Sequence, residues 1–130
     1  MVKELKKLNL YAGYLFFIFF IFSGIYLIAN VKDVNDDYIH MSGRANHIYL
    51  LLITLLNIVY GNIHMSSNLL SLIIRLLILI SGIFAAIGFF KETGSSLENR
   101  KNIPISIGLA FLSVVLFILN QKYITKKSKK

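Results

Sequence analysis

The sequence predicts an all-α membrane protein with four transmembrane helices in an antiparallel, up-down-up-down bundle. Of its 130 residues, 56% are hydrophobic and 15% are charged, whereas soluble domains carry roughly 25% charged residues. Mean hydropathy is +0.69, and the apolar residues gather in four long segments joined by short polar linkers. We therefore expect one domain over residues 1–130, ending in a short basic tail.

The first helix is predicted over residues 8–30. It holds an uncharged run at residues 15–22, and its length corresponds to roughly 33 Å at 1.5 Å per residue, enough to cross a bilayer. Lys3, Lys6 and Lys7 precede this run, as in a signal peptide, but the apolar stretch is too long and lacks a small-residue cleavage pattern. We expect the segment to remain as a helix.

The other three helices are predicted over residues 45–62, 68–90 and 103–121. The second and fourth are near the short end of the roughly 17–25 residues that a span needs, and the third contains Arg75. Residues 63–68 allow only a tight hairpin between the second and third helices. Asn68 or Ser67 is predicted to cap the third helix, and Asn102, followed by Pro104, the fourth.

Orientation follows from the basic residues. The two chain ends hold eight Lys and Arg residues, against five in the two loops expected on the opposite side. Because loops rich in Lys and Arg stay in the cytoplasm, we expect both termini there, in a plasma or inner membrane. The net charge of +8 comes mostly from these two ends, where attraction to anionic lipid headgroups is a sufficient role for the basic residues. The sequence has no pattern of aromatic and basic residues typical of a nucleic-acid interface.

Helix contacts are expected where small and polar residues recur in steps of three and four, since leucine gains little by leaving lipid. Each helix has one such stripe. The stripes are Asn9, Gly13, Phe16, Phe20, Ser23, Leu27 and Asn30; Arg44, His47, Leu51, Thr54, Ile58 and Gly61; Asn68, Ser71, Arg75, Ile78, Gly82 and Ala85; and Ser106, Ala110, Ser113, Phe117 and Asn120.

Alignment of the helices by depth predicts two polar clusters that serve as candidate ligand-binding sites. The inner cluster comprises Arg75, Asn57, Tyr14 and Ser113. The outer cluster comprises His47, Asn30 and Tyr26, with Ala86 and Ser106 at the same level and Arg44 one turn nearer the water.

Arg75 and His47 each allow two interpretations. Arg75 either extends to cytoplasmic phosphates or faces the bundle interior, where its partners would be amides, hydroxyls, backbone carbonyls, water or an anionic ligand. His47 is either a hydrogen-bonded interfacial side chain or a ligand. The sequence leaves both pairs of alternatives open.

The sequence gives little support for catalysis, metal binding or haem binding, each of which needs several reactive side chains close together. There are no cysteines, and no carboxylate lies inside the four apolar segments, so we predict no catalytic residues and no metal site. Haem would need two facing histidines, and only His40 and His47 lie at similar depth.

The sequence thus favours a non-enzymatic membrane protein, acting as a small subunit or as a binder of a lipid-like or anionic ligand in the bundle interior. Its expected partners are the bilayer, anionic headgroups, and another membrane protein or a second copy. One alternative is a redox protein holding haem or quinone near His47 and Arg44. Another is a small anion transporter or channel that uses Arg75.

Overall fold

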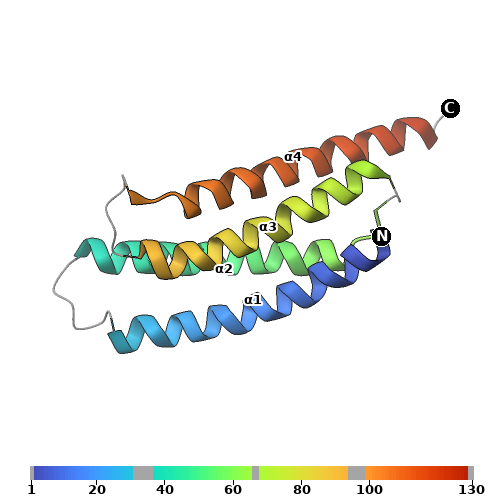
Figure 1. Ribbon diagram of the computed structural model, residues 1–130. Helices are drawn as coiled ribbons and strands as arrows, with labels where there is room; N and C mark the ends of the chain where they lie inside the picture. Colours follow the sequence, from blue (N-terminus) through green and yellow to red (C-terminus); the bar gives the residue numbers. More distant parts are fainter. Residues whose placement is uncertain (1, 31–36, 66–67, 94–98, 129–130) are drawn as a thin grey trace.

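The computed structural model describes residues 2–30, 37–65, 68–93 and 99–128, with side chains up to residue 121. They form four helices, α1 (Val2–Asn30), α2 (Asp37–Asn62), α3 (Leu69–Glu92) and α4 (Asn102–Ser128), which lie side by side in Figure 1. The described part of the chain is therefore all-helical, as predicted. The side chains of the predicted basic tail, from residue 122 onward, lie outside the described residues.

Packing is most extensive between α1 and α2 and between α3 and α4, and α3 also contacts both α1 and α2. In Figure 1, α1 and α4 lie on opposite sides of the α2–α3 pair. The apolar core accordingly centres on α2 and α3, where Leu50, Ile53, Ile74 and Ile78 are fully buried. The polar residues described below surround this core.

Three of the helices in the described residues are long and apolar enough to cross a membrane: residues 3–30, α3 and residues 102–121. The remaining helix, α2, is also long, at 26 residues, but it is less apolar. Its buried residues include Asn46, Thr54 and Asn57. Since α2 packs against both α1 and α3, these polar groups contact protein.

The helices extend beyond the predicted boundaries mainly at three places: α1 begins at Val2 instead of residue 8, α2 begins at Asp37 instead of near residue 45, and α4 ends at Ser128 instead of residue 121. The apolar run marks only the hydrophobic part of a helix, and α2 continues through a polar turn whose Asp37 suits the positive end of a helix dipole. Asn68 caps α3 as predicted, because its side chain accepts a hydrogen bond of 2.8 Å from the Ser71 backbone.

The predicted contact stripes match the buried faces of three helices. In α3, every stripe residue from Ser71 to Ala85 is buried, as are most of those in α1 and α4. The stripe of α2 is only partly right, since Arg44 is exposed and the most buried row lies one residue earlier, through Asn46, Leu50 and Asn57. This helix has neighbours on two sides, so a single stripe cannot describe it.

Candidate functional site

The inner polar cluster joins α1, α2 and α3 through two asparagines. The amide of Asn9 donates to Oδ1 of Asn57 at 3.2 Å and to the backbone carbonyl of Arg75 at 3.1 Å. Asn57 in turn donates to the carbonyls of Ile53 and Ile78, at 3.0 and 3.2 Å. Both asparagines are fully buried. Because leaving such groups unpaired in an apolar interior is costly, these bonds specify how the three helices meet.

Arg75 lies inside the bundle and is only 1% exposed. Its guanidinium donates to the backbone carbonyl of Tyr60 and, at 2.9 Å, to that of Ile63. These carbonyls belong to the end of α2, where a helix leaves its last acceptors unpaired and carries partial negative charge. Arg75 therefore caps the C-terminus of α2. Of the partners expected from the sequence, backbone carbonyls are the ones it contacts, and the interpretation in which it extends to lipid phosphates is wrong.

Of the other two residues predicted for the inner cluster, Ser113 lies inside the bundle and Tyr14 lies on its surface. Ser113 is fully buried, and its hydroxyl donates to the carbonyl of Ile74 at 3.0 Å, which links α4 to α3 beside Arg75. Tyr14 is 53% exposed, and the polar side chain that α1 contributes to the inner cluster is that of Asn9. The depth alignment failed here because it started α1 at residue 8, whereas the helix begins at Val2.

In the outer cluster, His47 packs between α1 and α3. Its Nδ1 lies 2.8 Å from the hydroxyl of Ser23, and its ring stacks on Phe20, with centroids 4.1 Å apart. Phe89 lies on a third side, at 6.5 Å. Predicted neighbours Tyr26 and Asn30 are exposed on α1. His47 is thus a partly buried packing residue with one ring nitrogen engaged.

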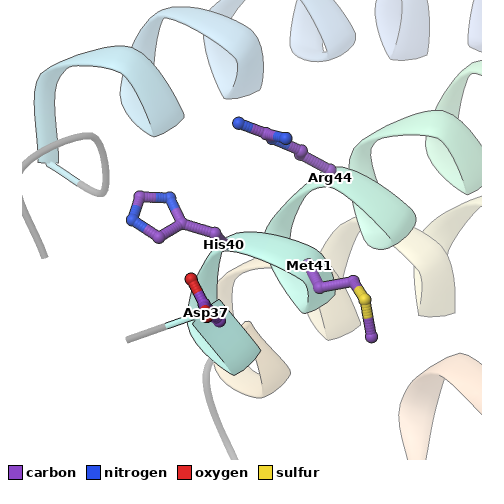
Figure 2. A pocket seen from close by; sticks show the side chains of 4 residues that line it. All are labelled: Asp37, His40, Met41 and Arg44. Carbon is purple, nitrogen blue, oxygen red and sulfur yellow. The ribbon is translucent and has the colours of Figure 1, made fainter. Parts of the chain in front are cut away.

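Arg44, predicted to accompany His47, is exposed. It lines a pocket at the N-terminal end of α2 together with Asp37, His40 and Met41 (Figure 2). The spacing of these four residues places them on one face of the helix. This pocket, unlike the two interior clusters, is open to the outside.

The contact between α3 and α4 contains a reciprocal serine pair that the sequence analysis did not assemble. Ser81 donates to the Ser106 carbonyl at 2.9 Å, and Ser106 donates to the Ser81 carbonyl at 2.7 Å. The hydroxyl of Tyr49, from α2, lies 3.0 Å from that of Ser106. Ser106 was placed beside His47, but Ser81 was not singled out, because Gly82 next to it fitted the stripe.

Glu92 is a buried carboxylate whose structural role was not predicted from the sequence. The predicted third helix ends at residue 90, which left Glu92 in the polar linker that follows, yet its side chain is only 2% exposed. Its carboxylate accepts from the backbone N–H groups of Lys101 and Ile103, at 2.8 and 3.0 Å, and from both the backbone and side-chain amides of Asn102. Glu92 thereby caps α4. The Asn102 side chain, predicted to cap this helix, donates through its amide to Glu92. The two-oxygen carboxylate of Glu92 satisfies several of the free N–H groups at once.

No group of three or more His, Asp or Glu side chains close enough to hold a metal ion occurs among the described residues. His40 and His47 lie on the same helix, about two turns apart, and so cannot face each other across a haem. Comparison with protein-family models, with curated proteins and with solved structures gives no match.

Proposed function

We propose that the chain is an integral membrane protein whose four helices cross a plasma or inner membrane as one antiparallel, up-down-up-down bundle, with both ends cytoplasmic. Pairings between early residues of one helix and late residues of the next support this arrangement. Asn9 meets Asn57 while Ser23 meets His47, and Ser81 meets Ser106 while Ser71 meets Asn120. The surplus of Lys and Arg at the chain ends supports the orientation.

The lower hydropathy of α2 is compatible with a fourth span. Its side chains Asn46, Thr54 and Asn57 are buried against protein, so they would not be placed in lipid. The lipid side of α2 would be formed instead by Ile48 and Leu52, which are exposed. A helix between two neighbours needs fewer apolar residues than one at the edge.

Within that membrane protein, the best-supported role is that of a non-enzymatic subunit. The observation that carries this proposal is the position of Arg75: its buried guanidinium is committed to the carbonyl of Tyr60 in the last turn of α2 and to that of Ile63 just beyond it. Both terminal nitrogens of the guanidinium are engaged by protein, and only Nε has no hydrogen-bond partner among the described residues. A guanidinium held in this way offers a ligand a single donor instead of its paired donors. The paired serines Ser81 and Ser106 are likewise engaged by protein.

The surface that would meet a partner is best sought on α4. This helix packs chiefly against α3, and its outer side exposes Ile105, Phe111 and Leu112 around Gly108. No other part of the described structure approaches within 4 Å of a Cβ atom built on Gly108. Small residues on such faces let a neighbouring membrane helix approach closely, whether from another protein or from a second copy.

The alternatives rest on fewer observations. Haem or quinone would need His47, whose Nδ1 is already paired with Ser23, and Arg44, which is exposed elsewhere. Anion transport would need Arg75 to release the carbonyls of Tyr60 and Ile63. Anionic lipid at the basic ends remains compatible with the subunit role, since Lys3 and Lys7 are exposed.

The proposal is tested by solubilising the protein in a mild detergent and measuring the mass and absorption spectrum of the particle. We expect a mass greater than that of one 14.8 kDa chain plus detergent, and no Soret band. A monomer at every detergent concentration would contradict the subunit role. A Soret band that copurifies with the protein and disappears in His47→Ala would favour the redox alternative.

A further inference from the structure

The pocket at the N-terminal end of α2 carries charges in a defined order along the helix. Asp37 lies at the first turn, His40 and Met41 one turn later, and Arg44 a further turn on. Seven residues separate Asp37 from Arg44, which corresponds to about 10.5 Å along the axis. In Figure 2, the Arg44 guanidinium and the His40 ring extend from the same side of α2. The face therefore presents an anion farthest from the bilayer and a cation nearest to it.

Directly beyond Arg44, the same face of α2 becomes apolar. Steps of four residues lead to Ile48 and Leu52, and Leu55 and Val59 continue the face toward the other end of the helix. All four are exposed, with Ile48 at 66%. Within the described residues, α2 thus has a charged pocket at one end and an uncovered apolar stripe beneath it.

From this arrangement we propose that the pocket binds the headgroup of a zwitterionic phospholipid with a terminal ammonium group, whose acyl chain lies along the apolar stripe. The order of charges in such a lipid is the order on the helix. Its phosphate lies at the membrane surface, where Arg44 can bind it, and its ammonium lies farther out, where Asp37 can accept its hydrogen bonds.

Charge composition favours this lipid over an anionic one. Arg44 can pair with any phosphate, but Asp37 lines the same pocket and would repel a headgroup that has no positive charge. A zwitterionic headgroup satisfies both side chains at once. The exposed Met41, which lies between Asp37 and Arg44, supplies an adaptable apolar contact for the two-carbon segment that joins the ammonium to the phosphate.

This inference rests on the proposed membrane location, so the experiment measures membrane insertion and lipid selectivity separately. The purified protein is reconstituted into phosphatidylcholine vesicles that contain either phosphatidylethanolamine or phosphatidylglycerol, and flotation reports membrane insertion. Lipids retained after mild detergent extraction are then counted by native mass spectrometry. Failure to float would count against the membrane location, whereas flotation without selective retention would count against the pocket alone.

We expect phosphatidylethanolamine to be retained several-fold more than phosphatidylglycerol. Arg44→Gln should abolish retention, and Asp37→Asn should abolish the preference. Lys91→Gln, which alters an exposed charge on α3, should change neither and serves as the matched control. Equal retention of both lipids by the unaltered protein, or a preference that survives Asp37→Asn, would overturn the proposal. Displacement of the lipid by soluble glycerophosphoethanolamine at equal concentration would also overturn it, in favour of a soluble ligand.

Discussion

The guanidinium of Arg75 donates to the backbone carbonyl of Tyr60, so that a charge on α3 closes the last turn of α2. At the opposite end of α3, the carboxylate of Glu92 accepts the first backbone N–H groups of α4. A cation at a helix C-terminus and an anion at a helix N-terminus both complement the helix dipole. The two buried charges of α3 thus tie it to both of its sequence neighbours.

Replacement of Arg75 tests this capping role. Arg75→Leu leaves the Tyr60 and Ile63 carbonyls without their donor, and an unsatisfied buried acceptor costs about 1–3 kcal/mol. We expect a clearly lower melting temperature by circular dichroism in detergent. Arg75→Lys keeps the charge but loses the planar guanidinium with its several donors. Its melting temperature should therefore lie between those of the unaltered protein and Arg75→Leu. An unchanged melting temperature in Arg75→Leu would mean that the capping bonds contribute nothing.

Glu92 is tested in the same manner at the start of α4. In Glu92→Gln one carboxylate oxygen becomes an amide donor, so the variant can no longer accept all of the N–H groups that now converge on it. Hydrogen exchange measured by mass spectrometry should accelerate in residues 101–105. Glu4→Gln removes an exposed carboxylate from the first turn of α1 and should leave that segment unaffected. Equal exchange in both variants would contradict the cap.

The contact between α1 and α3 depends on Gly82. A side chain at this position would enter the ring of Phe16, so Gly82→Leu should separate the helices and lower the melting temperature strongly. Leu79→Ala, at a half-buried position, should be milder. Because the clash is with one ring, adding Phe16→Ala to Gly82→Leu should restore part of the loss. A double variant no more stable than Gly82→Leu would show that Phe16 is not the obstacle.

Close approach of α1 and α2 is tested at Gly61. A Cβ atom there would lie 2.7 Å from Cα of Leu10, a backbone atom that cannot move aside, so Gly61→Ala should destabilise the protein. Gly108→Ala makes the same chemical change on α4 where no such contact exists. In the isolated chain, without a partner helix on α4, it should be neutral or stabilising by about 0.5–1 kcal/mol, since alanine favours helix. Similar melting temperatures for the two variants would contradict the α1–α2 packing.

The sequence predicted the helices and much of their packing, because both depend on local periodicity. Stripes in steps of three and four found the buried Asn9, Ser71 and Asn120. The same method could not place Glu92, since its partners lie beyond a linker and nothing near it in the sequence marks it as buried. The alignment of the helices by depth paired Tyr14 with Arg75, because depth depends on where each helix begins, which hydrophobicity alone does not define.

The proposal that all four helices cross the membrane is tested most directly at α2, because α2 is the least apolar of them. The chain contains no cysteine, so Asp37→Cys and Asn62→Cys each introduce a single thiol, at opposite ends of α2. We predict that a membrane-impermeant maleimide added to intact cells labels Asp37→Cys alone, and that Asn62→Cys reacts only after the membrane is opened. Labelling of both thiols from the same side would show that α2 does not cross.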